Sequence, residues 1–116
     1  MSSALLVGYD PDALPGHDAA ALNAALDAEL KRFAEHGIEA GSVLVVWDGS
    51  AEGVLAAALS ERAWDVVVVG GGIRKTEELL PLFEQVLNLT RRHAPQAALA
   101  FNTGIGDSVE AARRWL

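Results

Sequence analysis

Four short apolar runs divide this chain, and longer stretches with helical spacing separate them. The runs cover residues 4–9, 42–47, 65–70 and 97–102. None of them alternates cleanly between apolar and polar positions. Near-continuous apolar runs of this length are typical of strands that are covered on both faces, as in a parallel sheet. The pattern therefore predicts four parallel strands, each followed by a helix.

The first helix is predicted between Asp18, a good N-cap residue, and Gly37, which suits the C-terminal cap. The second begins near Ser50. We expect both helices to turn an apolar stripe toward the sheet, because apolar residues recur at helical spacing in each. These positions are Leu22, Leu26, Leu30 and Phe33 in the first helix, and Val54, Leu55, Ala58 and Leu59 in the second.

The third helix contains Pro81, which fits a first turn but not a helix interior. A loose turn at residues 76–80 is therefore expected before the regular helix. The last helix starts with Asp107 and Glu110 in the spacing of a capping box, and Trp115-Leu116 is expected to pack on the sheet. The predicted inward positions of the third helix are Leu79, Leu80, Phe83, Val86 and Leu87.

Four strand–helix units joined by right-handed crossovers form a parallel sheet with helices on both faces. The common solution is a flavodoxin-like, doubly wound α/β fold, here with four strands in the order 2-1-3-4. Residues 1–116 are expected to form one domain. The fourth strand would be an open edge, which a second copy of the chain could cover, so a homodimer is predicted.

Composition excludes several classes of protein. The 116 residues are 51% apolar, carry a net charge of −7 and include no cysteine. An acidic surface argues against nucleic-acid binding, and without cysteine there is no disulfide framework or thiolate nucleophile. Residues 1–10 do not have the pattern of a signal peptide, and no apolar run is long enough to cross a membrane. The sequence therefore predicts a soluble cytoplasmic protein without a membrane partner.

In this architecture, ligands bind beyond the carboxyl ends of the strands, at the switch point between strands 1 and 3. Three loops meet there, after strands 1, 3 and 4. Asp12 and His17 belong to the first of them, beside the residues that we select as candidates. The candidate ligand-binding residues are Asp10, Gly70, Gly71, Gly72, Arg74, Lys75, Asn102 and Thr103.

The loop after the third strand, in the stretch "VVVVGGGIRKTEELLP", has three glycines followed by two cations. Glycines allow positive φ and a close approach of the backbone to a ligand, and the cations suit a phosphate or a carboxylate. The loop matches neither the G-x-G-x-x-G motif nor the P-loop, in which only Lys75-Thr76 agrees. An anion site and a simple strand-to-helix turn both remain open.

Asp10 and Asp12 are similar to the acidic pair of a response-regulator receiver domain, and Thr103 occupies the place of its hydroxyl residue. The chain departs from that pattern at the end of its third strand, where glycines replace the phosphorylated aspartate. Receiver-type phosphotransfer is therefore not expected. If the protein catalyses a reaction, Asp10 or His17 is the candidate general base. The sequence indicates no metal site and no particular cofactor, and it leaves open whether the protein is an enzyme.

The segments "VVVVGGGIR", "LFEQVLNLTRRHAP", "AFNTG" and "EAARRW" resemble a family of small uncharacterised α/β proteins of bacteria and fungi. The resemblance covers residues 65–115. It implies a stand-alone α/β domain and supplies no activity. It draws attention to Arg74, Glu84, Asn88, His93, Asn102 and Arg114.

Two functions are consistent with these observations. The first is binding of a small molecule that carries a phosphate or a carboxylate, held by the glycine loop and Arg74 and oriented by Asn102 and Thr103. The second is a non-catalytic, receiver-like interaction module that pairs through its edge strand or its third helix. The first is preferred because the cation pair of an otherwise acidic protein follows the glycines at the predicted ligand edge.

Overall fold

The computed structural model describes residues 1–13 and 18–116. Its elements, in chain order, are β1 (Ser3–Tyr9), η1 (Pro11–Ala13), α1 (Ala19–Glu35), β2 (Glu39–Val45), α2 (Ala51–Ser60), β3 (Val66–Val69), α3 (Gly71–Arg74), η2 (Glu77–Leu79), α4 (Leu80–His93), β4 (Ala98–Phe101), η3 (Ile105–Asp107) and α5 (Ser108–Arg113). The elements labelled η are single 3-10 turns.

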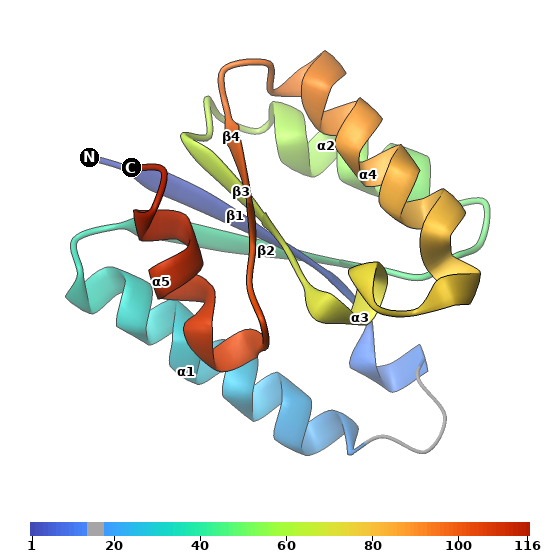
Figure 1. The fold of residues 1–116 in the computed structure, drawn as a ribbon, viewed down its shortest axis with the longest axis horizontal. Helices are drawn as coiled ribbons and strands as arrows, with labels where there is room; N and C mark the ends of the chain where they lie inside the picture. The colour runs from blue at the N-terminus through green and yellow to red at the C-terminus, as the bar shows by residue number, and fades with distance from the viewer. Residues whose placement is uncertain (14–17) are drawn as a thin grey trace.

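The four strands form one parallel sheet in the order β2-β1-β3-β4. Helices α1 and α5 lie on one face, and α2 and α4 lie on the other (Figure 1). This arrangement confirms the predicted α/β fold, its four strands and their order. It places the carboxyl ends of β1 and β3 at the switch point, as expected for a doubly wound sheet.

The apolar strands serve two cores because their side chains alternate between the two faces of the sheet. Leu5 and Val7 of β1 pack with Leu55 of α2 and Val86 of α4. On the opposite face, the neighbouring β1 residues pack with residues of α1 and α5; these are Ala4 and Leu6 on the strand, and Phe33 and Val109 on the helices. Covering both faces explains why the strands read as unbroken apolar runs.

Strand β2 begins three residues earlier than its apolar run predicts and ends at Val45. Its first residues pair with the start of β1, from Ser3↔Glu39 onward. Gly41 belongs to this part, and a Cβ there would lie only 3.1 Å from the indole of Trp64. Backbone pairing with β1 thus sets the polar start of the strand. Trp47, which the apolar run includes, lies beyond the end of β2 and is 45% exposed.

The predicted ends of the first helix are confirmed. The Asp18 carboxylate accepts a hydrogen bond from the Ala21 N–H at 3.0 Å, as an N-cap residue should. Gly37 follows the helix with φ 72°, a left-handed conformation that favours glycine. The loose turn expected near Pro81 is also present, as the 3-10 turn η2, and Pro81 lies in the first turn of α4.

Several predicted inward positions are wrong. Val54, Leu80, Trp115 and Leu116 are all exposed. Val54 and Leu80 lie at the edge of the apolar face of their helices. At that edge, a small rotation of the helix about its axis moves a side chain from the core to solvent. Because α5 ends at Arg113, Trp115 and Leu116 are outside regular structure and do not return to the sheet.

Strand β4 is the predicted open edge. Its alternate residues Leu99 and Phe101 are partly exposed, and the Arg114 guanidinium donates to the Phe101 carbonyl at 2.9 Å. A cation that covers an edge carbonyl reduces the capacity of that edge to pair with another strand. The predicted homodimer stays a prediction.

Candidate functional site

A cavity of about 460 Å³ lies at the carboxyl ends of the strands, on the face covered by α1. Its floor includes Leu6 and Gly8 of β1 and Val68 of β3, and Leu22 and Leu26 of α1 form the opposite wall. The loops after β3 and β4 complete it. Its volume falls within the range of about 300–1,000 Å³ that is usual for small-molecule sites. The walls are mainly aliphatic.

Six of the eight candidate residues line this cavity. They are Gly70, Gly71, Gly72, Lys75, Asn102 and Thr103. Arg74 and Asp10 are not among the lining residues, although both belong to the adjoining loops. The strand order alone brings the glycine loop and the loop after β4 together. Ser108, Ile105 and the wall formed by α1 were missed in the sequence, because only their position over the sheet edge reveals them.

The glycine loop is a single helical turn, α3, and it does not use the positive φ that glycine allows. Among the described residues, only Gly37 has positive φ. Gly70 allows its own backbone to lie close to that of Val7. Its N–H donates to the Val7 carbonyl at 2.8 Å, and a Cβ would lie 3.3 Å from that oxygen. A Cβ at Gly72 would lie at an ordinary 3.7 Å from Tyr9. The glycines thus fit a compact turn at the cavity.

The two cations of this loop have different surroundings. Lys75 is exposed and lines the cavity, and its Nζ donates to the Thr103 carbonyl at 2.7 Å. Arg74 instead donates to the Asn102 carbonyl and lies 5.3 Å from the ring centre of Phe101. Burial lowers the pKa of Arg74. Arg74 therefore ties the loop to the end of β4, and Lys75 is the cation that faces the cavity.

Asn102 is 5% exposed, and its side chain is hydrogen-bonded to the segment that follows β4. Its Nδ2 donates to Ser108 Oγ at 2.9 Å, and that hydroxyl donates to the Ile105 carbonyl at 2.8 Å. Because the single hydroxyl proton is used at Ile105, Ser108 must accept from the amide. The Asn102 Oδ1 is buried and has no hydrogen-bond partner among the described residues.

Thr103 and Asp107 form a closed turn beside Asn102. The Asp107 carboxylate accepts from the backbone N–H groups of Thr103 and Gly104 and from the Thr103 hydroxyl. The hydrogen bond from that hydroxyl, helped by those from the backbone, lowers the pKa of Asp107. The predicted capping box is wrong, because the Glu110 carboxylate pairs with Arg32.

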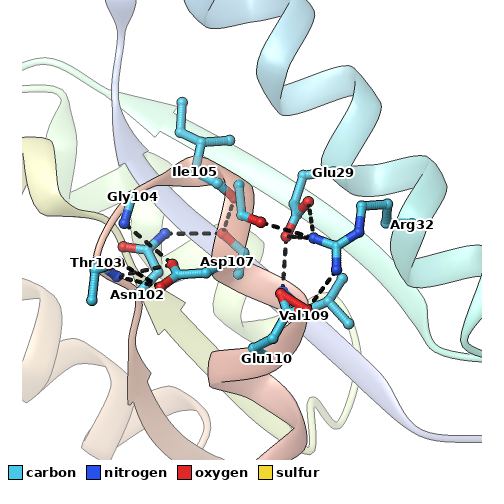
Figure 2. A network of polar contacts seen from close by, with 11 residues as sticks. Glu29, Arg32, Asn102, Thr103, Gly104, Ile105, Asp107, Val109 and Glu110 are labelled. Atoms are coloured by element: carbon cyan, nitrogen blue, oxygen red, sulfur yellow. Dashed lines mark hydrogen bonds and ion pairs between the residues drawn. The ribbon is translucent and has the colours of Figure 1, made fainter.

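The segment 105–110 is fixed to α1 by a polar cluster centred on Glu29 (Figure 2). Glu29 is 2% exposed, and its carboxylate accepts from Arg32 Nη1 at 2.7 Å and from the Val109 N–H at 2.9 Å. Arg32 also reaches the Gly106 carbonyl at 2.8 Å and Glu110 Oε2 at 2.5 Å. We call Glu29, Arg32 and their three contacts with Gly106, Val109 and Glu110 the α1 clamp.

The α1 clamp was missed in the sequence, although a signal exists. Glu29 lies between Leu26 and Phe33 in the predicted apolar stripe of α1, and Arg32 follows at i+3. A buried acid requires a partner, and a cation one turn away can supply it. The pairing with Arg32 lowers the pKa of Glu110, and the hydrogen bonds from Arg32 to Glu110 and Glu29 raise the pKa of Arg32.

Of the two candidate general bases, only Asp10 lies in the part of the chain that the structure describes. The Asp10 carboxylate accepts from the Asp12 N–H at 2.9 Å in a local turn. His17 lies outside the described residues. Within residues 1–13 and 18–116, no cluster of three or more His, Cys, Asp or Glu side chains is placed to hold a metal ion.

The residues highlighted by the resemblance are dispersed. The side chain of Asn88 donates to the Glu84 carbonyl within α4, and Arg114 covers the edge of β4. Only Asn102 among the six lines the cavity, with Arg74 tied to its carbonyl. The resemblance therefore points to no second site, and the predicted family stays a prediction.

Comparisons with known proteins support the fold alone. No protein-family model and no curated protein matches the chain. A fragment of a "putative lipoprotein" from Peptoclostridium difficile 630 has a similar structure, with a TM-score of 0.53 and 13% identity over 87% of this chain and 72% of that one. In the described part of the protein, no helix is both long and apolar enough to span a bilayer.

The α1 clamp gives a first prediction. Glu29→Ala should lower the free energy of unfolding by about 3 kcal/mol, because it removes the acceptor of the Val109 N–H and the carboxylate that pairs with the Arg32 guanidinium. Glu35→Ala, an exposed acid of the same helix, should change it by less than about 0.5 kcal/mol. Urea unfolding measures both, and equal effects would show that the clamp does not stabilise the fold.

The lowered pKa values of Glu110 and Asp107 give a second prediction. A carboxyl group with a folded pKa below its unfolded value stabilises the protein above the unfolded pKa, here 4.5 for Glu110, and loses that effect as pH falls through the folded pKa. Unfolding free energy should therefore fall with acidification between about pH 5 and pH 3. Glu110→Gln should flatten the curve, and an unchanged slope would refute this role.

The glycine turn gives a third prediction. Gly70→Ala should destabilise the protein by about 1 kcal/mol, because its Cβ would press on the Val7 carbonyl oxygen. Gly72→Ala meets only ordinary contacts within a helical turn and should stabilise it by about 0.5 kcal/mol. Chemical denaturation of the two variants measures both changes in unfolding free energy. Changes of the same sign would contradict the view that Gly70 is needed for close contact with the Val7 carbonyl while Gly72 only adds flexibility to the unfolded chain.

Proposed function

We propose that this protein binds a small organic acid in the cavity between α1 and the carboxyl ends of the strands. The observation that carries the proposal is a mainly aliphatic cavity of about 460 Å³ with an ammonium group on its lining. Lys75 is the only charged side chain among the described lining residues of a protein whose net charge is −7. The ligand would place an apolar body between the wall formed by Leu22 and Leu26 and the strand floor at Leu6, and an acidic group at Lys75.

The charges around Lys75 favour a carboxylate over a phosphate. Arg74 is engaged by the Asn102 carbonyl and by Phe101, so it does not add a second cation to the cavity. The Asp107 carboxylate lies in the neighbouring turn, where it would repel a doubly charged group. One ammonium matches one negative charge, and the apolar walls supply most of the binding free energy.

A series of straight-chain acids tests this function. Burial of one methylene group contributes about 0.8 kcal/mol, so the dissociation constant should fall about threefold to fourfold for each carbon added from butyrate to octanoate. Calorimetry can measure the series on the purified protein. If no acid of the series binds at millimolar concentrations, the proposed function is wrong.

Two matched pairs of variants locate the binding. Lys75→Gln should weaken octanoate binding about fivefold, whereas Lys31→Gln, an exposed lysine of α1, should not. Ala25→Trp should block the cavity that Ala25 lines, and Ala28→Trp, on the same helix, is its control. Equal binding by all four variants would mean that octanoate binds elsewhere.

A further inference from the structure

Strand β4 carries apolar side chains that the rest of the described chain covers only in part. Leu99 and Phe101 are aligned with Val67 and Val69 of β3, so these side chains lie on the α4 face of the sheet. The two valines are fully buried, whereas Leu99 is 37% exposed and Phe101 is 43% exposed. After β4 the chain turns to the opposite face, where α5 packs with α1 (Figure 1). The α4 face of β4 is therefore left open to a partner.

Helix α4 extends this apolar surface. Phe83 packs edge-to-face on Phe101, with 5.8 Å between the ring centres. Leu87 lines a groove between α4 and β4 together with Leu99. Leu80, at the start of α4, is 63% exposed. Apolar residues gathered on one surface, rather than scattered singly, mark an interaction site. We call these residues the α4–β4 surface; they are Leu80, Phe83, Leu87, Leu99 and Phe101.

A charge pattern follows the same side of α4. One stripe along the helix, at positions i, i+4, i+7 and i+11, contains Leu80, Glu84, Leu87 and Arg91. Its acid and its base are both exposed, and they lie about 10 Å apart along the helix axis. Among the described residues, neither of them forms an ion pair. The stripe thus presents a negative group toward the N-terminus of α4 and a positive group toward its C-terminus.

We propose that the α4–β4 surface binds the same surface of a second copy of this chain. A two-fold interface brings identical patches together, so it requires a patch that complements itself. A two-fold axis that crosses α4 midway between Glu84 and Arg91 makes the two helices antiparallel. It then sets the acid of each copy opposite the base of the other, and two opposite-charge contacts form in one dimer. This inference does not rest on the proposed function, because the cavity lies on the other face of the sheet.

The same axis gives the exposed Leu80 a place in the interface. Under this rotation Leu80 of one copy lies level with Pro95 of the other, just beyond the C-terminal end of α4. Pro95 lines the groove between α4 and β4, together with Ala97 and Leu99. An exposed leucine is thus brought to an apolar groove, and its burial there contributes to the affinity.

The partner is expected on the α4 face of β4 and not on the hydrogen-bonding edge of the strand. Arg114 donates to the Phe101 carbonyl at 2.9 Å, so it already engages an acceptor that a pairing strand would need. Since α4 has 14 residues and is about 21 Å long, the contact is small compared with that of an obligate dimer. We therefore expect a reversible dimer with a dissociation constant in the micromolar range.

Analytical ultracentrifugation of the full chain tests whether this dimer exists. Between about 5 µM and about 1 mM, the protein should change from monomer to dimer and associate no further, because a two-fold contact closes on itself. A monomer over the whole range would overturn the proposal, even if the surface binds some other protein. Species larger than a dimer would also overturn it, because they require a contact that does not close.

Charge reversal tests the antiparallel arrangement. Glu84→Arg and Arg91→Glu each put like charges at both contacts, so each variant should dimerise at least about 10-fold more weakly than the wild type. An equimolar mixture of the two variants restores opposite charges at both contacts, and it should form a heterodimer within about threefold of the wild-type affinity.

Matched controls for charge reversal are available on the described chain. Glu35→Arg on α1 and Arg92→Glu on α4 change exposed charges outside the stripe, and both should dimerise like the wild type. Unchanged dimerisation of Glu84→Arg and Arg91→Glu would overturn the proposal. A mixture of these two variants that stays monomeric would overturn it as well, because the lost affinity would then not come from this pairing.

A second pair of variants tests the apolar contact without changing any charge. Leu80→Ser should weaken the dimer at least about 10-fold, because it removes a leucine from each half of the interface. Val54→Ser, at an exposed apolar position of α2, should not weaken it. Both positions are exposed, so this comparison still decides the question if a charge variant does not fold. A Leu80→Ser protein that dimerises like the wild type would overturn the proposal.

Discussion

The buried carboxylate of Glu29 is the constraint on which the candidate site depends. A charge removed from water must be paired, and here Arg32 and the Val109 N–H surround it. Through these contacts α1 is joined to the segment 105–110, two elements that are far apart in the chain (Figure 2). Since residues of α1 and of this segment both line the cavity, the same cluster that satisfies Glu29 also holds two adjoining walls of the site together.

The cavity itself results from a change in side-chain size along the face under α1. Toward the C-terminal end of α1, Phe33 packs closely against Ala4 and Val66 in a dry core. Toward the carboxyl ends of the strands, several lining positions have small residues, which are Gly8, Gly71 and Gly72 on the sheet side and Ala25 on α1. Small residues on both sides leave a volume that no side chain of the described lining fills, and a ligand can occupy it.

The sequence was sufficient to predict the sheet and the edge at which the cavity lies, because apolar runs and crossover rules depend on local pattern and on chirality. Its failures have a common cause. The start of β2 at Glu39 is set by pairing with Ser3. The contacts of Glu29 with Val109 and of Arg74 with Asn102 join residues more than 25 positions apart. Lys75, Asn102 and Thr103 could be predicted because they directly follow strands at the ligand-binding edge of the sheet. The apolar wall formed by α1 could be identified only from the packing of that helix over the sheet.

The central claim is that the space between α1 and the loops after β3 and β4 is a ligand site. An amide-detected NMR titration of the isotope-labelled protein with octanoate tests it most directly. The account predicts saturable shifts at Leu22, Gly72 and Ile105, which line the cavity, and none at Gly53 of α2 on the far face. Shifts confined to the exposed edge of β4 and to α4, or no saturable shift, would contradict it.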